Sequence, residues 1–251
     1  MTNLEIHSMI RLWTSWGCNM TNNFENLKKW LVFEPGTYYK FVALVRAKDF
    51  TDGKYEPVLN TKERGEIFVR QWFIDSQDSI DKYKDDMINL CKATKARLYV
   101  TTDRKSTKKT ILTMAWQLDD YIRQLINNPN APISIKKLSK FSASASQMAE
   151  CSSGPKYWLI DIDGNGLEED KKQGMISKLY VCFTRLFIGK EVIENDTPNG
   201  KHILVERTFD IKSFIDSYLE KNNEDSKLLL DYKNNWEVKE NALTLVYENL
   251  H

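Results

Sequence analysis

The chain has few of the residues that structural metal sites and disulfide frameworks require. Its 251 residues include three histidines and four widely spaced cysteines, Cys18, Cys91, Cys151 and Cys182. No two cysteines form a C-x-x-C pair, which argues against a zinc ribbon and against a disulfide framework. A reducing cytosol is therefore the expected environment, and a metal site built from several histidines is not expected.

The sequence also lacks a strong net charge and a long hydrophobic run. Its 36 Lys and Arg balance 35 Asp and Glu, so the formal net charge is +1 and any anion-binding surface has to be local. No run approaches the roughly 18 apolar residues of a membrane span. The opening segment, MTNLEIHSMIRLW, has no apolar core of signal-peptide length. We expect a cytoplasmic protein that does not contact a membrane.

Composition divides the chain into two parts joined by a connector. Residues 1–130 alternate extended, aromatic-rich segments with amphipathic helical patterns and predict an N-terminal α/β module. Residues 131–155 are rich in Asn, Pro, Ser and Ala and predict a connector in the form of a long, partly ordered loop. Residues 156–251 predict the order β-α-β-β-α-β, with an Asn-Gly hairpin turn and a last strand over 236–247. This order is that of a ferredoxin-like or RNA-recognition-type unit, so the expected fold class is α+β.

The segment 157-YWLIDIDGNGLEEDKK-172 contains the opening of a calcium-binding EF-hand loop. The run from Asp161 to Gly166 fits the first positions of that loop, but the position of its bidentate glutamate is Lys172. A cation there repels the ion, and the preceding KYWLI is typical of a strand rather than a helix. The two aspartates of the segment are therefore expected at the end of a buried strand.

Side-chain alternation along the predicted strands places three acids and a histidine on one face of the sheet. Asp161 and Asp163 lie on the first strand, His202 on the hairpin and Glu237 on the last strand, all facing away from the helices. In a sheet of order 4-1-3-2, these strands are neighbours. Carboxylates suit Mg²⁺ or Mn²⁺, and a pair of such ions is what two-metal phosphoryl transfer requires. The sequence therefore predicts a site for metal and phosphate on this face.

These residues resemble the motifs of the archaeo-eukaryotic primase superfamily, which includes the primase-polymerases. The matching pieces are 158-WLIDID-163, 200-GKH-202 and 236-WE-237. A wider pattern across residues 96–247 is similar to uncharacterised phage-type proteins, through the pieces ARLYV, R-x-S, DID, TPNGKH and TLVY. Two positions depart from the family pattern, because Gly200 stands in place of a serine and the third acid is Glu rather than Asp.

The resemblance implies nucleotidyl transfer on a nucleic-acid template. Asp161, Asp163 and Glu237 would hold the Mg²⁺ or Mn²⁺ ions, and His202 would contact the triphosphate of the incoming nucleotide. Asp231 is a rival for the third metal ligand, because its spacing from the histidine also suits the family. The implied partners are nucleoside triphosphates, a single-stranded DNA template and a separate replicative helicase, in a bacterial or phage-infected cell.

Basic residues gather in the segment 92-KATKARLYVTTDRKSTKK-109, which carries seven basic side chains against one acid. It spans a predicted strand-to-helix junction, and a helix N-terminus flanked by basic residues is a reasonable phosphate site. An ordinary solvated helix start explains the same pattern. Candidates for nucleic-acid contacts are Arg97, Arg104, Lys105 and Lys108, and weaker candidates for nucleotide contacts are Lys201 and Lys239.

Two other classes of function fit parts of the sequence. The run Glu237-Val238-Lys239 matches the E-x-K of metal-dependent nucleases, which need a further acid upstream, from Asp231 or Asp210. The non-enzymatic alternative is a degenerate primase-like module that binds nucleic acid or protein as an accessory. A Walker-type nucleotide site is excluded, since the chain contains no G-x-x-x-x-G-K-[ST].

Overall fold

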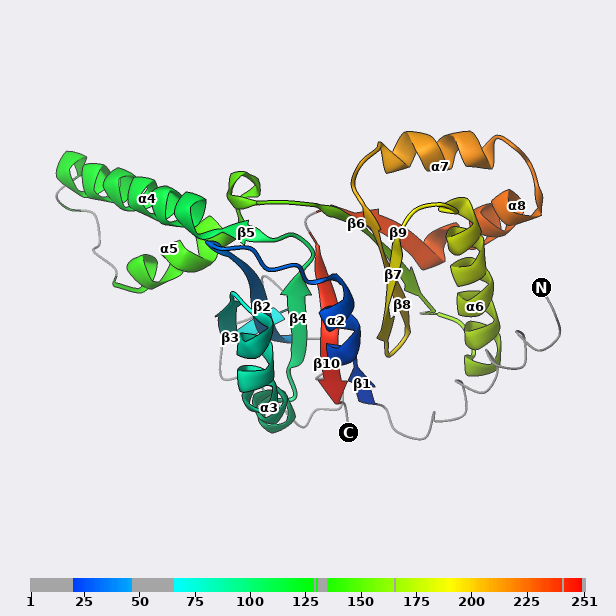
Figure 1. Cartoon of the computed structure of the whole chain (residues 1–251), viewed down its shortest axis with the longest axis horizontal. Helices are drawn as coiled ribbons and strands as arrows, with labels where there is room; N and C mark the ends of the chain where they lie inside the picture. Colours follow the sequence, from blue (N-terminus) through cyan, green and yellow to red (C-terminus); the bar gives the residue numbers. More distant parts are fainter. Residues whose placement is uncertain are drawn as a thin grey trace.

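The computed structural model of the chain is a mixed α+β fold with two antiparallel sheets standing side by side (Figure 1). The structure describes residues 20–46, 66–128, 130, 135–164, 166–240 and 242–249. Within these ranges, every helix is too short or too polar to cross a membrane. The α+β class agrees with the expectation from the sequence.

The first sheet has the strand order β1-β10-β4-β2-β3, and the short β5 pairs with β2. Its strands are β1 (Met20–Asn22), β2 (Thr37–Arg46), β3 (Glu66–Ile74), β4 (Arg97–Thr101), β5 (Lys105–Ser106) and β10 (Leu243–Asn249). Two helices, α2 (Phe24–Trp30) and α3 (Gln77–Thr94), supply apolar residues to the core on one face. Phe41 of β2 and Leu98 of β4 are fully buried in this core. Leu44 and Arg46 of β2 face the opposite side of the sheet, because side chains alternate along a strand.

The second sheet has the strand order β7-β8-β6-β9, with every pair antiparallel. Its strands are β6 (Tyr157–Asp163), β7 (Val192–Thr197), β8 (Gly200–Glu206) and β9 (Trp236–Lys239). One face packs against α6 (Glu169–Leu186), α7 (Ile211–Leu219) and α8 (Glu224–Asp231), through a core that includes Ile160, Phe183 and Trp236. The helix predicted after β6 is present as α6, whereas α8 is an additional helix, so two helices rather than one connect β8 to β9.

The predicted last strand over 236–247 is in fact two strands in different sheets. β9 pairs with β6, but β10 returns to the first sheet and lies between β1 and β4. The last strand within the predicted unit of residues 156–251 therefore belongs to the first sheet. Five consecutive residues of β10, from Thr244 to Glu248, are buried, because this strand is covered on both faces. Such a run shows that a strand is central, but not which sheet it joins.

The two sheets share part of one core. Leu159 and Leu204 of the second sheet pack with Phe24 and Leu27 of α2 and with residues of the first sheet. The ring of Trp30 in α2 also meets Tyr157 of β6 edge to face, with centroids 5.7 Å apart. α2 therefore packs against both sheets and holds the face of the second sheet that carries Tyr157 and Leu159 next to the first sheet.

The predicted connector is helical rather than a partly ordered loop. Within residues 131–155, the structure shows α5 (Ile135–Gln147) and a 3-10 turn, η2 (Ala149–Cys151), and α5 packs on α4 (Thr107–Asn127). The Ser- and Ala-rich composition suggested a loop, but small side chains also allow close helix contacts, and Ala145 and Ser146 are fully buried. The pair projects from the body of the molecule (Figure 1). Large apolar side chains remain exposed on α4, namely Ile111, Leu112, Trp116, Leu118, Ile122 and Ile126.

We expect Tyr247→Ala in β10 to lower the free energy of unfolding by about 3–5 kcal/mol, as truncation of other buried aromatics does. Tyr247 is 1% exposed and lies in the core of the first sheet. Urea denaturation followed by circular dichroism measures the change, with Leu230→Ala as a control because Leu230 is 53% exposed. A loss below about 1 kcal/mol would contradict the central position of β10.

Candidate functional site

A cleft of about 360 Å³ lies between the two sheets. The second sheet lines it with Asp161, Asp163, His202 and Lys239, and the first sheet with Arg46, Arg97 and Tyr99. These residues come from the face of the second sheet opposite α6, α7 and α8, and from the face of the first sheet opposite α2 and α3. The cleft therefore brings acidic groups on one wall opposite basic and aromatic groups on the other.

Strand register places three of the predicted site residues in one row. Asp161 of β6 is directly opposite His202 on β8 and Glu237 on β9. Asp163 lies two residues further along β6 and on the same face, as the alternation predicted. The structure thus brings these four residues together. Glu237 is the most solvated of the acids, with a side chain 62% exposed, compared with 21% for Asp161.

Gly200 lies opposite Asp163, at the start of β8. A Cβ atom at this position would collide with the backbone carbonyl oxygen of Ile162 on β6. The two strands approach so closely here that only glycine fits without a backbone shift. The strand spacing therefore accounts for glycine at position 200.

Asp161 is the most strongly perturbed acid of the site. Its Oδ2 lies 2.7 Å from Nζ of Lys239, and its Oδ1 lies 3.5 Å from Nε2 of His202. Burial alone would raise the pKa of Asp161, but the hydrogen bonds from His202 and Lys239 and the positive charge of Lys239 hold this pKa well below its usual range. The carboxylate is therefore charged throughout the physiological range.

Lys239 pairs with Glu237 as well as with Asp161. Burial would lower the pKa of Lys239, but the two carboxylates outweigh that effect and raise it. Within the described residues, no group of three His, Cys, Asp or Glu side chains is already arranged around a metal position. Two acids, Asp161 and Glu237, instead flank the ammonium group of Lys239.

His202 is held in place by the first sheet. The backbone N–H of Leu245 in β10 donates to Nδ1 of His202 at 3.3 Å, and Oγ1 of Thr244 lies 3.1 Å from the same atom. Because a backbone amide can only donate, Nδ1 accepts and the ring proton is on Nε2, which faces Asp161. Nδ2 of the buried Asn195 donates to Oγ1 of Thr244 at 2.9 Å. Thr244 and Asn195 thus orient His202. The sequence pointed to Thr244 only through the TLVY piece, and it gave no indication of Asn195.

Asn23 connects β10 to β7 at the same junction. Its Nδ2 donates to the carbonyl oxygens of Asp196, at 2.8 Å, and of Leu245, at 3.0 Å. Its Oδ1 accepts from the N–H of Asp196 at 3.2 Å. Asn23 is 2% exposed, so these bonds are sheltered from water. They fix the second sheet to the strand that orients the histidine.

The wall from the first sheet supplies two arginines. The guanidinium of Arg46 lies over the ring of Tyr99, 5.4 Å from its centroid. Nη2 of Arg97 is 3.1 Å from Oε1 of the fully buried Glu248. Arg97 was predicted to contact nucleic acid, and it does line the cleft. Arg46 was not identified from the sequence, because it lies at the end of a strand with no basic neighbour.

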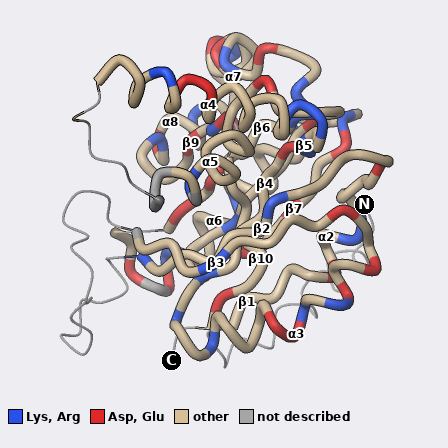
Figure 2. Tube along the Cα trace, turned by 90° about the vertical axis from the view of Figure 1, so that its left-hand side faces the viewer, with Lys and Arg blue, Asp and Glu red and all other residues tan. Residues whose placement is uncertain are grey.

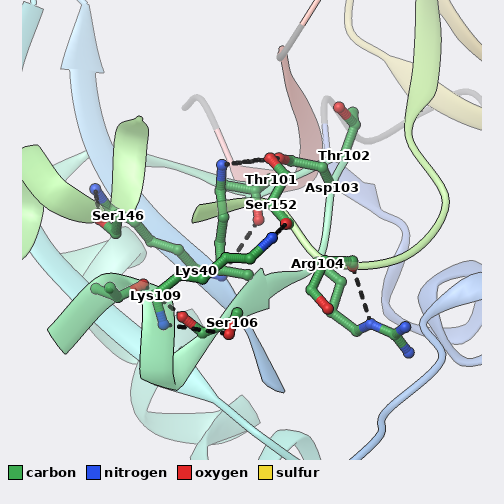
Figure 3. Close-up of polar contacts among 12 residues, drawn as sticks. Lys40, Thr101, Thr102, Asp103, Arg104, Ser106, Lys109, Ser146 and Ser152 are labelled. Atoms are coloured by element: carbon green, nitrogen blue, oxygen red, sulfur yellow. Dashed lines mark hydrogen bonds and ion pairs between the residues drawn. The ribbon is translucent and has the colours of Figure 1, made fainter. Parts of the chain in front are cut away.

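Two other residues of the predicted basic patch are interior groups. Nη2 of Arg104 pairs with Oε1 of Glu34 at 2.8 Å. Nζ of Lys105 pairs at 2.7 Å with Oδ2 of Asp103, which is labelled in Figure 3. Arg104 and Lys105 are each 3% exposed. In contrast to the expectation, both are buried and neutralised by acids, so they form no exposed phosphate site. Lys108 is exposed in the first turn of α4. Figure 2 shows basic and acidic residues interspersed along the chain on the side that it presents.

Lys40 is a further buried lysine beside this network. Its Nζ donates to Oγ of Ser146 at 3.2 Å and to the carbonyl oxygen of Ala143 at 3.4 Å (Figure 3). Burial and the nearby charge of Lys105 lower the pKa of Lys40 to about 8. These bonds attach α5 to β2 and explain why the Ser-rich segment is ordered.

Lys201 does not point into the cleft. As the neighbour of His202 on β8, it faces the opposite side of the sheet, where its Nζ pairs with Asp196 at 2.8 Å and with Glu194 at 3.3 Å. The prediction that Lys201 contacts the nucleotide is therefore wrong for this cleft, because neighbouring residues on a strand face opposite sides and His202 faces the cleft. Asp231, the rival third acid, ends α8 in the helical layer and does not line the cleft. Glu237 does not line the cleft either, but it lies directly opposite Asp161 in the sheet.

In comparisons with protein-family models, with curated proteins and with solved structures, no match to the chain was found.

Replacement of Asp161 by Asn should lower the free energy of unfolding at pH 7 by about 1–3 kcal/mol, the range for a buried hydrogen bond to a charged group. A depressed folded-state pKa gives stability that is present above the usual pKa of 3.8 and is lost as the pH falls below it. The difference between Asp161→Asn and the parent should therefore shrink below pH 4. Urea titrations at several pH values measure it, with the exposed Asp231→Asn as a control. A difference that does not depend on pH would contradict the assigned ion pair.

Gly200→Ser should destabilise the protein by about 1–3 kcal/mol, the usual range for overpacking. The added Cβ has to push β8 away from the carbonyl of Ile162. Thermal unfolding measures the loss, and Gly174→Ser on α6 is a matched control because a Cβ there meets no neighbouring atom. A neutral Gly200→Ser would show that the strands are further apart than described.

Proposed function

We propose that the protein is a metal-dependent nucleotidyltransferase of the primase or primase-polymerase type, and that the reaction takes place in the cleft between the sheets. The observation that carries the proposal is the cross-strand row of His202, Asp161 and Glu237, of which His202 and Asp161 line the same cleft as Arg46 and Arg97. Acids that can hold metal ions on one wall and guanidinium groups on the other suit a substrate that carries several phosphates.

The strand order supports the same proposal. Along the chain, the second unit runs β6-α6-β7-β8-α7-α8-β9, and its sheet has the order β7-β8-β6-β9. We interpret this as a ferredoxin-like or RNA-recognition-type unit with α8 added. In the primase superfamily, as the sequence motifs imply, such a unit carries the metal ligands and the histidine on its open face.

The side chains have distinct roles in the proposed reaction. Asp161, Asp163 and Glu237 would hold one or two Mg²⁺ or Mn²⁺ ions, which supply charge neutralisation at the phosphates and activate the attacking oxygen. His202 presents an Nε2–H whose direction is fixed by the bonds to Nδ1, so it can donate to a phosphate oxygen. The wall with Arg46 would contact either the triphosphate or the backbone of the template.

The proposed partners follow from the same chemistry. They are nucleoside triphosphates and a single-stranded DNA template, and a separate helicase would supply the unwound template in the cytoplasm of a bacterial or phage-infected cell. Arg97 is buried and paired with Glu248, but it lines the cleft and remains a candidate for template contacts, together with the exposed Lys108. Arg104 and Lys105 are not candidates, because they are buried and do not line the cleft.

A metal-dependent nuclease is the second candidate, and one observation favours it. Lys239 contacts both Asp161 and Glu237, which reproduces an acid followed by E-x-K on neighbouring strands. Asp161 supplies the acid that the sequence had assigned to Asp231 or Asp210. Asp210 instead caps α7, where it accepts from the N–H of Lys212. In a nuclease, Lys239 would orient the attacking water beside the metal.

The test is incubation of the purified protein with Mn²⁺, labelled ribo- or deoxyribonucleoside triphosphates and single-stranded DNA. We expect labelled oligomers from the parent and background signal from Asp161→Ala plus Asp163→Ala, which removes two metal ligands. Glu194→Ala plus Asp196→Ala is the matched control, because it removes two acids from the opposite face of the same sheet, and it should retain product.

Other outcomes distinguish the alternatives. Cleavage of the DNA without oligomer synthesis, lost in the Asp161 and Asp163 double variant, would contradict the primase proposal and establish the nuclease. Neither synthesis nor cleavage, together with DNA binding that both variants retain, would indicate an accessory module that binds nucleic acid without catalysis.

A further inference from the structure

Lys239 lies at the centre of the acidic cluster. Its Nζ is 2.7 Å from Oδ2 of Asp161 and makes a second ion pair with Glu237. Two of the three proposed metal ligands are therefore already neutralised by a side chain of the same chain. A cation is held at the place where the proposed function requires a divalent metal.

The register explains how one lysine reaches both acids. Lys239 is opposite Leu159 and Glu237 is opposite Asp161, so Lys239 lies two residues from one acid along β9 and diagonal to the other across the strands. Its side chain is 39% exposed, so the flexible stem is not locked into the core. The ammonium can leave the carboxylates by rotation of its own side chain, with no change in the strands.

The charges around Lys239 show what it does without metal. Asp161, Asp163 and Glu237 carry like charges on adjacent positions of one face, which is unfavourable unless a cation compensates them. Lys239 provides that compensation. A divalent ion that binds the same oxygens has to displace the ammonium of Lys239. Breaking the two ion pairs costs free energy, so the divalent ion binds more weakly.

We propose that Lys239 is an internal counter-ion that divalent metal must displace from Asp161 and Glu237, so that this lysine sets how tightly the site binds Mg²⁺ or Mn²⁺. The inference rests on the proposed metal site and deepens it. It makes Lys239 a residue that tunes metal affinity. In the displaced position, the ammonium remains in the cleft and is available to a phosphate group.

The chain contains a matched control for this role. Lys201 on β8 also pairs with two carboxylates, those of Glu194 and Asp196, but on the opposite face of the same sheet. Its removal changes the net charge of the protein as much as removal of Lys239 does. Only Lys239, however, touches the proposed metal ligands.

The experiment is titration of Mn²⁺ into the purified full chain without nucleotide or DNA, with free Mn²⁺ measured by electron paramagnetic resonance. Lys239→Met removes the charge and keeps an unbranched apolar stem, and it should tighten Mn²⁺ binding roughly tenfold, as expected for the loss of two competing, partly exposed ion pairs. Lys239→Arg keeps the competing charge and should stay within about threefold of the parent, and so should Lys201→Met.

A second readout follows displacement directly in the parent protein. Reductive methylation of lysines, quantified by mass spectrometry, should modify Lys239 faster when Mn²⁺ is present, because the ammonium is released from its carboxylates. The labelling rate of Lys201 should not change. Unfolding curves of each variant establish that the proteins compared are folded.

The results separate this inference from the proposed function. Saturable Mn²⁺ binding that is equally tight in the parent and in Lys239→Met, with unchanged labelling of Lys239, would overturn the counter-ion role and leave the metal site standing. The absence of saturable binding in both proteins would overturn the metal site and the counter-ion role together. Tighter binding in Lys239→Met but not in Lys201→Met would support both.

Discussion

The structure of the site depends on the hydrogen bonds that β10 makes to buried polar side chains of the other sheet. The N–H of Leu245 and the hydroxyl of Thr244 meet Nδ1 of His202, and Asn195 donates to the same hydroxyl. Buried polar groups that lose such partners cost about 1–3 kcal/mol each, so the network specifies one arrangement of the sheets. The orientation of the histidine and the width of the cleft both follow from it.

This junction also explains why the last strand of the chain belongs to the first sheet. If β10 had stayed with the second unit, His202 would have no partner for Nδ1, and the open face with its acids would lie exposed. By returning, β10 completes the first sheet between β1 and β4 and closes one side of the cleft. The two halves of the chain therefore form one structural unit at the site, although their sheets are separate.

Local features of the sequence predicted much of the site. Alternation along β6, β8 and β9 placed Asp161, Asp163, His202 and Glu237 on one face, because a period of two follows from strand geometry alone. The turn residues Pro198, Asn199 and Gly200 located the hairpin, because such residues favour the tight turns that join antiparallel strands. The fold class and α6 were also predictable from periodicity. The same alternation of side chains, applied to the residue before His202, would have excluded Lys201 from the cleft.

What the sequence could not show depends on contacts between distant residues. The return of β10 depends on its buried polar partners in another sheet, and the burial of Arg104 and Lys105 depends on Glu34 and Ser152. Composition also favoured a loop where α5 forms, since the contacts of Lys40 and Ser146 that hold this helix link positions more than a hundred residues apart. In each case the local sequence fits either a buried or an exposed position, and contacts with residues far away in the sequence decide which one forms.

The central claim is that metal binds between the two sheets, and paramagnetic broadening tests it most directly. Addition of substoichiometric Mn²⁺ to ¹⁵N-labelled protein should first broaden the amide signals of Asp161, Asp163 and His202, together with those of Leu245 and Tyr99 on the facing wall. Signals from both sheets are predicted because the cleft is formed by both. Broadening centred on Glu194 and Asp196, or distributed evenly over surface acids, would contradict the account.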